Sequence, residues 1–495
     1  MGSVIRAAFK VHRWIGICFG LATFFALASG LALHWHTYSF PTEAEVLRGY
    51  GGPLVATELG ETTVPAGRVA TLHHLNQRLV WEVEPVSGGA PRLFDARTGD
   101  SIATIADSEA ARVAARAVAG DSAAAQTLLI HGYDNFYVQG KPPLPAYRVS
   151  FHRPRRVDVY VAMSTGSVTA VIGWREKLTD LFGEKIHYLK IGALRTVTTP
   201  RFVIMGAFAT AVLTGAIAGL LYGVPLLLRR LSGAQRWGPL LRSLHNVAGA
   251  IVGLFIVMWG TTSYLMLWYP TMDPNADERA RVAGPHLGGQ FQLTPRAAIA
   301  ATRAPVFALR ATQLLDRPVY AAIHGDGSAT LIDARSGVTL SPVGDSLLRA
   351  IVDRYLGTPA RIRRITQLRG YDEYYHASHD DRGYSFDGNP RPLPVYRVDL
   401  EDGDEPSPLY VRADRGDVVG RVDADYRWFR WLGSGIHDLN FPVLFQRRPR
   451  LWSWVILSPV LIGLLASAIG LWLGATYAAR SFTLRRRPPV ISVSR

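Results

Sequence analysis

The sequence has a single cysteine, Cys18, among its 495 residues, and this residue lies within an apolar stretch. One cysteine excludes an intramolecular disulfide, and the lack of a CxxC pair argues against a thiol-ligated zinc or iron–sulfur centre. The chain also lacks a Gly-rich phosphate loop between a strand and a helix, so it has no nicotinamide or flavin dinucleotide fingerprint. A group held by imidazole, such as haem, is still compatible with this composition.

Long apolar runs, in contrast, are plentiful. A run of about 20 helical residues crosses a hydrocarbon core of about 30 Å. Four membrane helices are therefore expected, at Trp14–Leu33, Phe202–Leu228, Leu244–Trp268 and Trp452–Tyr477. The first run also carries a small-residue pattern, Ala26-Leu27-Ala28, that resembles a signal-peptide cleavage site. Its length, and a matching run in mid-chain, favour a membrane helix that is retained.

The net charge of +15 comes from 54 Lys and Arg against 39 Asp and Glu, and many basic residues flank the apolar runs. That placement favours membrane topology over nucleic-acid binding as the reason for the charge. Basic residues precede the first run, fill the link between the second and third, and follow the fourth. The chain is thus expected to span a bacterial inner membrane in several passes, with both termini cytoplasmic and residues 35–200 and 270–450 periplasmic. Arg447, Arg448 and Arg450 lie on the predicted outer side, a conflict that long translocated loops tolerate.

Short motifs recur in the same order in the two halves of the chain. His12-Arg-Trp-Ile-Gly16 matches His245-Asn-Val-Ala-Gly249, Asp95-Ala-Arg-Thr-Gly99 matches Asp333-Ala-Arg-Ser-Gly337, Gly132-Tyr-Asp134 matches Gly370-Tyr-Asp372, Leu144-Pro-Ala-Tyr-Arg-Val149 matches Leu393-Pro-Val-Tyr-Arg-Val398, and Ile186-His-x-Leu189 matches Ile436-His-x-Leu439. This ordered repetition predicts an internal duplication of the form helix, soluble domain, helix.

Each soluble domain is predicted to be α+β. Apolar and polar residues alternate at Ala146–Phe151, Val157–Ala162 and Val168–Ile172, and helical patterns occur at 108–119 and 345–356. The expected order is the N-terminus with the first helix (1–36), the first periplasmic domain (37–200), the second helix (201–229), a cytoplasmic link (230–243), the third helix (244–269), the second periplasmic domain (270–450), the fourth helix (451–478) and a basic tail (479–495).

Four of the 14 histidines occupy matching positions in the two halves. His12 and His245 begin the first and third membrane helices, while His187 and His437 each precede the next helix by about 15 residues. An intramembrane imidazole marks a functional site by default, and two facing imidazoles can hold a haem iron from both axial sides. We therefore expect His12 to pair with His245 near the cytoplasm, and His187 with His437 near the periplasm.

Glycines beside the first pair leave two interpretations open. Gly16 and Gly20 follow His12 by one and two turns, and Gly249 and Gly253 do the same after His245. Such small residues make room for a porphyrin or for a closely packed helix. In the second case the two histidines lie at the level of the lipid headgroups and bind nothing.

The pair His187 and His437 requires a further structural element, and His34 is an alternative to one of its two ligands. His187 and His437 need an interfacial amphipathic helix to bring them to the membrane. His34 is a reserve ligand for either one, because 22 residues of helix return it to within about 40° of the face that carries His12. Its counterpart in the second half is Leu267, so the repeat gives His34 no support.

The chain resembles the PepSY-associated transmembrane family over nearly its whole length. The resemblance rests on three motifs: a helix that opens with His-Arg-Trp-x-Gly, the Asp-x-x-Thr/Ser-Gly turns and the Ile-His-x-Leu segments. Members of that family include inner-membrane ferric-siderophore reductases, and its soluble modules resemble small α+β PepSY domains. The resemblance implies two b-type haems and a periplasmic ferric siderophore as the electron acceptor, which releases Fe(II) on reduction. The electron donor is then external, either a quinol or a cytoplasmic reductase.

Two further functions stay open. One is a non-redox membrane scaffold whose PepSY modules bind a peptidase or an uptake partner. The other is a cytochrome with a different periplasmic acceptor, such as copper or a protein thiol.

Aromatic and polar loops in the soluble halves are weak candidates for substrate binding. Aromatic rings with a few polar groups suit an organic chelate, but the same loops can simply anchor the Leu-Pro-x-Tyr-Arg strands. The candidate residues are Tyr133, Asp134, Tyr371, Asp372, Tyr375 and His376. His376 and His379 also have a metal-like spacing, without a carboxylate or thiol framework to define a site.

Overall fold

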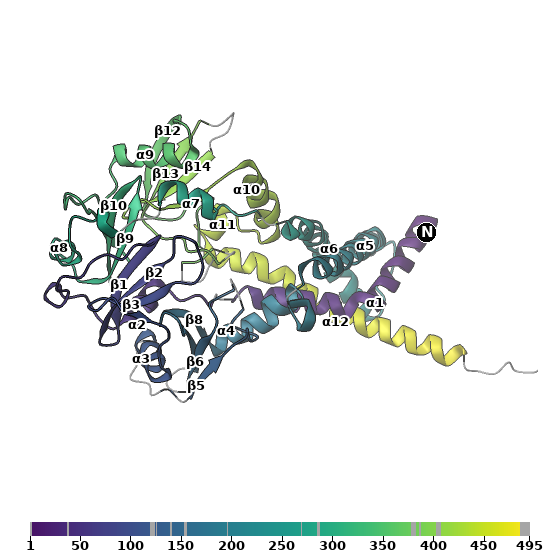
Figure 1. The fold of residues 1–495 in the computed structure, drawn as a ribbon. Coiled ribbons are helices and arrows are strands. Elements are labelled where there is room, and N and C mark those ends of the chain that lie inside the picture. Colours follow the sequence, from purple (N-terminus) through teal and green to yellow (C-terminus); the bar gives the residue numbers. More distant parts are fainter. Residues whose placement is uncertain are drawn as a thin grey trace, which may run out of the picture. The chain divides into compact units, whose positions relative to one another are not determined.

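A computed structural model describes residues 2–485 except 37–38, 119–123, 125, 139–140, 153–155, 196, 269, 285–287, 378–382, 386–387 and 402–406 (Figure 1). The chain divides into two compact units. The helical unit comprises residues 1–36, 178–270 and 425–495, and the β-rich unit comprises residues 37–177 and 271–424. Each unit is therefore assembled from segments that are distant in the sequence.

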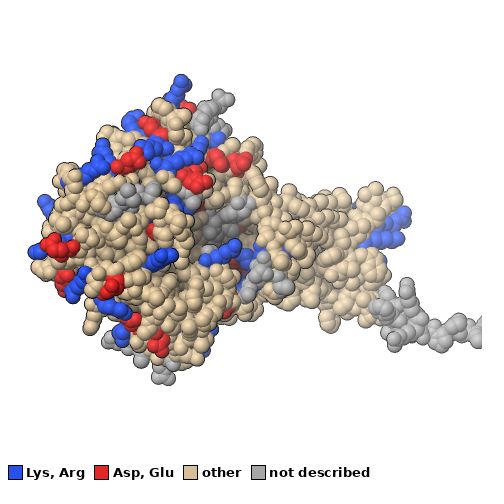
Figure 2. Space-filling model, in the orientation of Figure 1, with Lys and Arg blue, Asp and Glu red and all other residues tan. Residues whose placement is uncertain are grey.

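Four long apolar helices make up most of the helical unit. They are α1 (Ser3–Leu33), α5 (Thr198–Leu231), α6 (Leu240–Leu267) and α12 (Pro449–Arg485). All four are long and apolar enough to cross a membrane, so the predicted spans are confirmed. The helices extend up to about three turns beyond them, the most at the start of α1, and α6 ends one residue earlier than predicted. On the face shown in Figure 2, Lys and Arg gather at the end of this unit that carries the N-terminus, and the middle of the helices shows almost no charge.

The four helices pack in a ring in which α1 contacts α5 and α12, and α6 contacts the same two helices. The helices α1 and α6 therefore lie across the ring from each other. Two glycines let neighbouring helices approach closely, because a Cβ on Gly20 would lie 3.1 Å from Leu471 and one on Gly253 would lie 2.8 Å from Leu220. Near the middle of the ring, Gly463 makes room for Leu27 and Val252.

Short irregular helices complete the helical unit. Two contain a π-helical turn, η2 (Asp180–Lys185) after α4 (Trp174–Thr179), and η5 (Phe429–Gly435) after α10 (Ala424–Trp428). The remaining ones are η3 (Gly192–Arg195) and α11 (Pro442–Phe445). The turn η2 packs on α1, and η5 packs on α6. A π-helical turn is rare and often marks a functional position, and here both of them immediately precede a predicted histidine ligand.

The β-rich unit contains three antiparallel sheets among the described residues. The largest has the strand order β11-β10-β9-β1-β2-β3-β4. Its strands are β1 (Val69–Leu75), β2 (Arg78–Glu84), β3 (Arg92–Asp95), β4 (Ser101–Ile102), β9 (Val306–Leu314), β10 (Arg317–His324) and β11 (Ala329–Asp333). Because β1 pairs with β9, the two soluble segments of the chain share one sheet.

The other two sheets have the same strand arrangement as each other. One runs β5-β6-β7-β8 and the other β12-β13-β14-β15. Their strands are β5 (Gln126–Ile130), β6 (Ala146–Phe151), β7 (Val157–Ala162), β8 (Val168–Gly173), β12 (Ile362–Leu368), β13 (Val395–Leu400), β14 (Ser407–Arg412) and β15 (Val418–Arg421). These α+β segments are of the kind that the alternating patterns predict.

Helices pack between or against these sheets. They are α2 (Glu43–Tyr50), η1 (Ala56–Glu58), α3 (Asp107–Ala117), α7 (Ala276–Val282), η4 (Gly288–Gln290), α8 (Pro295–Ala300) and α9 (Asp345–Leu356). The helix α3 shares a hydrophobic core with β6, β7 and β8, and α9 shares one with β13, β14 and β15. Apolar side chains from η1 and α8 pack with residues of β1 and β9 in a separate core.

The pairing of β1 with β9 gives a direct stability prediction. Leu72 is fully buried and lies opposite Leu309 in that pair. We expect Leu72→Ala to cost the β-rich unit about 2–5 kcal/mol, because a buried leucine is replaced by a cavity. Thermal unfolding of the full chain in detergent measures the loss. Val86→Ala, at an exposed turn residue, is the control, and an equal effect of both substitutions would show that the shared sheet is not a core element.

Candidate functional site

The structure brings His12 and His245 together. Their ring centroids are 6.1 Å apart, with the ring planes inclined by 44°. One ring comes from α1 and the other from α6, so they approach each other across the ring of helices. The predicted pairing of these two histidines is therefore present in the structure.

Both rings are held from behind by a main-chain carbonyl. Nδ1 of His12 lies 2.8 Å from the carbonyl oxygen of Gly215 in α5, and Nδ1 of His245 lies 2.9 Å from that of Ala466 in α12. A carbonyl oxygen can only accept a hydrogen bond, so Nδ1 of each ring carries the proton. Nε2 is then the nitrogen with the available lone pair, which is the form that binds a metal.

A glycine makes each of these contacts possible. In an α-helix the carbonyl of residue i also accepts from the amide of residue i+4, and four residues after Gly215 and Ala466 the chain has Gly219 and Gly470. A Cβ on Gly219 would lie 2.7 Å from Nδ1 of His12, and one on Gly470 would lie 2.9 Å from Cε1 of His245. These two glycines therefore leave the space that the imidazoles occupy.

The glycines that follow His12 and His245 on their own helices divide between two roles, close helix packing and room for a planar group. Gly20 and Gly253 are helix-packing glycines, as their leucine neighbours show. A Cβ on Gly16 or Gly249 would meet no atom within 4 Å. Open space beside these two positions is the room that a planar group next to the histidines requires.

The second pair is held by side-chain hydroxyls. Nδ1 of His187 lies 3.0 Å from Oγ of Ser29 on α1, and Nδ1 of His437 lies 2.8 Å from Oγ1 of Thr262 on α6. Each hydroxyl also donates its hydrogen to a helix carbonyl, that of Ala26 or Met258, at 2.8 Å. A hydroxyl has one hydrogen to give, so it accepts from the ring, and Nδ1 again carries the proton.

The electrostatics of the second pair are consistent with two neutral, neighbouring rings. Burial lowers the pKa of His187 to about 4. Burial, together with the charge that His187 would carry, lowers the pKa of His437 to about 3. The interaction means that the two imidazoles lie within electrostatic range of each other, and the direction of both shifts keeps them uncharged at neutral pH.

The local backbone at these histidines is the same in both halves. Leu189 and Leu439, two residues after His187 and His437, have positive φ angles of 51° and 50°. A leucine rarely adopts this conformation, because its Cβ is crowded there. The turn that follows each histidine is thus maintained at a conformational cost.

His34 takes a different position. Its ring stacks on Trp452 at a centroid distance of 5.0 Å and meets Trp35 edge-on at 5.3 Å. Two tryptophan contacts account for the placement of this side chain. Its role as a reserve ligand therefore stays a prediction that these contacts do not favour.

The aromatic loops of the β-rich unit use their polar groups internally. Oδ1 of Asp134 accepts the amides of Phe136 and Tyr137, and Oδ2 accepts the hydroxyl of Tyr160 at 2.7 Å. The ring of Tyr137 is buried and stacks on Tyr160 at 4.3 Å, and burial raises the pKa of Tyr137 to about 12. The hydroxyl of Tyr133 donates to the carbonyl of Pro142.

The corresponding loop of the second half repeats this arrangement. Asp372 accepts the amide of Tyr375 at 2.7 Å and the hydroxyl of Tyr410 at 2.8 Å. Tyr375 is fully buried, and the hydroxyl of Tyr371 donates to the carbonyl of Arg391. His376 lies next in the chain, with Nδ1 3.2 Å from the carbonyl oxygen of Ala377. These contacts match the alternative in which the loops anchor the fold. His379 lies outside the described residues.

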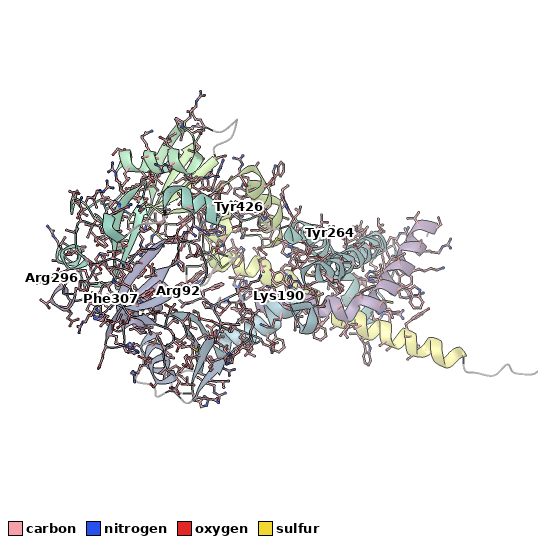
Figure 3. The ribbon with its side chains drawn as sticks, viewed as in Figure 1. Arg92, Lys190, Tyr264, Arg296, Phe307 and Tyr426 are labelled. Atoms are coloured by element: carbon pink, nitrogen blue, oxygen red, sulfur yellow. The ribbon has the colours of Figure 1, made fainter. Side chains whose placement is uncertain are left out.

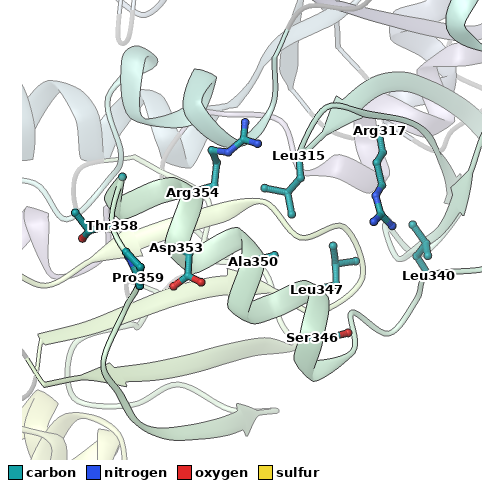
Figure 4. A pocket seen from close by; sticks show the side chains of 11 residues that line it. Leu315, Arg317, Leu340, Ser346, Leu347, Ala350, Asp353, Arg354, Thr358 and Pro359 are labelled. Atoms are coloured by element: carbon teal, nitrogen blue, oxygen red, sulfur yellow. The ribbon is translucent and has the colours of Figure 1, made fainter.

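The β-rich unit also has an open pocket of about 730 Å³ beside α9 (Figure 4). Leu315, Leu340 and Leu347 give it apolar walls. Its charged residues are Arg317, Asp353 and Arg354, of which Arg354 pairs with Asp316 at 2.6 Å. The pocket contains none of the residues that the sequence analysis selected.

Comparison with known proteins agrees with this architecture. A family model for the PepSY-associated transmembrane region matches residues 9–475. The chain belongs to the PepSY-associated transmembrane family. No curated protein matches it. Membership shows a multi-pass membrane protein of the PepSY class, and the histidine pairs described above lie within the part of the chain that the family model covers.

Sequence reasoning found the four histidines but missed the residues that hold them. Ser29 and Thr262 each follow their paired-helix histidine, His12 or His245, by 17 residues. This equal spacing was the one sequence feature that indicated an equivalent role for Ser29 and Thr262. It was not sufficient, because single Ser, Thr and Gly residues are common in membrane helices.

The hydroxyl contact predicts a specific tautomer. Solid-state ¹⁵N NMR of the protein with no added ligand should show His437 protonated at Nδ1, because the Thr262 hydroxyl, which donates to the carbonyl of Met258, can only accept from it. Thr262→Val should weaken that preference. Ser263→Ala removes a neighbouring hydroxyl that donates to the carbonyl of Trp259 and does not contact the ring, so it should leave the tautomer unchanged. Protonation at Nε2 in the unsubstituted protein would contradict the assignment.

Proposed function

We propose that the helical unit binds two b-type haems, one between His12 and His245 and the other between His187 and His437, and that the protein transfers electrons across the membrane. The single observation that carries this proposal is the first pair of rings. They face each other at 6.1 Å, and both have Nδ1 held by a carbonyl. At the second pair, Nδ1 of each ring is likewise held, there by a side-chain hydroxyl.

The ring separation fits a shared metal. A metal–imidazole bond is about 2.0 Å long and a ring nitrogen lies about 1.1 Å from the ring centroid, so two imidazoles on opposite sides of one iron have centroids about 6 Å apart. The observed 6.1 Å agrees with this spacing. Space for the porphyrin plate is supported by the open positions beside Gly16 and Gly249.

The protein's own residues orient the ligands. Gly215 and Ala466 fix the tautomer of the first pair, and Ser29 and Thr262 fix that of the second. Such hydrogen bonds to the other nitrogen of a ligating histidine set its orientation and raise its basicity. Bound haem would supply a one-electron carrier whose potential depends on these axial histidines and on their surroundings.

Two levels in the membrane are also supported. His12 and Ser29 lie on the same helix, and 17 residues of α-helix cover about 25 Å. The first pair is therefore close to one end of the helices, and the second pair is close to the other. Electrons would then pass from one side of the bilayer to the other through two cofactors.

The proposed orientation is that of a bacterial inner-membrane protein. The basic residues before α1, between α5 and α6, and after α12 favour a cytoplasmic location for those segments under the positive-inside rule. The β-rich unit then lies in the periplasm. The matching motifs and matching contacts of the two halves support an origin by internal duplication.

We propose a ferric siderophore as the periplasmic acceptor, on the basis of the resemblance to ferric-siderophore reductases. Hard oxygen donors hold Fe(III) tightly and Fe(II) far less well, so one electron per iron releases the metal for uptake and leaves the chelator intact. The donor is external to the chain, because the sequence has no nicotinamide or flavin fingerprint. A quinol or a cytoplasmic reductase would fill that role.

Single-site variants test the haem assignment. His12→Ala should remove one haem equivalent per chain and leave the other, and His437→Ala should remove the other one. His34→Ala should retain both, because its ring is held by tryptophans. Haem per chain is measured from the reduced absorption bands after purification. Retention of both haems in the first two variants, or loss of one in His34→Ala, would refute these pairings.

Reoxidation of the reduced protein tests the acceptor. We expect a ferric siderophore to reoxidise the haem bands at least tenfold faster than an equal concentration of Cu²⁺ or of a protein disulfide, with Fe(II) appearing in equal amount. Faster reoxidation by copper or by the disulfide would show that the acceptor is not a ferric siderophore. A protein without haem, purified from haem-replete cells, would instead favour the non-redox scaffold.

A further inference from the structure

A second group of metal-ligating side chains lies in the helical unit, apart from the four paired histidines. His36, Asp180 and Glu184 each offer one ligand atom, and the three atoms lie within 4.8 Å of one another. We infer that these three residues form a binding site for one divalent transition-metal ion. His36 follows the end of α1, and the two carboxylates belong to η2.

The donor set defines the class of metal. Imidazole suits Fe²⁺, Zn²⁺ and Cu²⁺, and carboxylate suits Mn²⁺ and Mg²⁺. One imidazole with two carboxylates therefore favours Fe²⁺, Mn²⁺ or Zn²⁺ over the purely oxygen-bound cations. Three protein ligands also leave a coordination position for water, as in catalytic zinc sites.

The carboxylates of this cluster are largely buried, so a nearby positive charge stabilises them. His36 and Glu184 are both less than one-tenth exposed, and Nε2 of the histidine is 3.7 Å from the glutamate. A cation at this place would relieve the cost of burying two carboxylates so close together.

Two lysines now provide that charge. Lys185 pairs with Asp180, and Lys190 pairs with Glu184. Lys190, labelled in Figure 3, has a side chain that is 35% exposed, against 8% for Lys185. It can move into solvent at little cost, so a metal ion can replace it on Glu184. The structure thus shows the site with a lysine in competition for one ligand.

The second half of the chain shows that a π-helical turn followed by a paired histidine does not need these carboxylates. At the positions that correspond to Asp180, Glu184 and Lys190, counted from the paired histidines, the chain has Arg430, Ser434 and Asn440. Arg430 donates to the side chain of Asn440 at 2.8 Å and to its carbonyl at 2.9 Å, and Asn440 donates to Ser434 at 3.1 Å. An arginine-centred network with no carboxylate at these three positions stabilises the same turn, so the acidic cluster is additional to the fold.

The location suggests which metal matters. Glu184 is three residues before His187, so the site adjoins the pair that we assign to the outer haem. Fe²⁺ is the ion that reduction of a ferric siderophore would release there, an identification that rests on the proposed function. The site would retain the released ion before it is passed on.

Titration of the full-length protein in detergent with Mn²⁺ tests the site. The room-temperature EPR signal of free Mn²⁺ falls as the ion binds, so it counts bound metal without interference from haem. We expect one saturable Mn²⁺ per chain, displaced by Fe²⁺ under anaerobic conditions. His36→Gln and Glu184→Gln should each weaken binding at least tenfold, and Ser434→Ala, at the matching position of the second half, should leave it unchanged.

Lys190→Ala gives a result of the opposite sign, which misfolding cannot imitate. Without the competing ammonium group, Mn²⁺ should bind several-fold more tightly. No saturable binding to the unsubstituted protein, equal binding in His36→Gln and Glu184→Gln, or no gain in Lys190→Ala would each overturn the inference. Haem bands without Mn²⁺ binding would refute this site alone, whereas Mn²⁺ binding without haem would refute the proposed function alone.

Discussion

The hydrogen bond from Nδ1 of each paired histidine is the interaction on which the rest of the helical unit depends. An imidazole in a membrane is costly unless it has a partner, and each of the four rings has one on its rear nitrogen. For His12 and His245 the partner is a main-chain carbonyl, and for His187 and His437 it is a hydroxyl. The same bond satisfies a polar group within the helices and leaves the lone pair of Nε2 available.

That bond explains features that otherwise look unrelated. Gly219 and Gly470 are required because any side chain would fill the place of a ring. The π-helical turns pack on α1 and α6, and together with the left-handed Leu189 and Leu439 they bring His187 and His437 against these helices. Strained or unusual backbone of this kind is retained where the surrounding structure holds a functional group in position.

Much of the fold follows from the sequence alone, because membrane spans depend on composition and length. The apolar runs predicted all four helices, and strand periodicity predicted β6, β7 and β8. The matching histidines predicted the pair His12 and His245. What could not be predicted depends on contacts between distant residues. The pairing of β1 with β9 joins two segments more than 200 residues apart, and no local pattern indicates which strand edge meets which.

The central claim is that the helical unit holds two bis-histidine haems, and the absorption spectrum of the purified full-length protein tests it most directly. The protein, prepared from haem-replete cells, should show the bands of low-spin b-type haem when oxidised and again after reduction. Quantification should give two haems per chain. A colourless protein that is folded, or a single haem that persists when all four paired histidines are replaced together, would contradict the account.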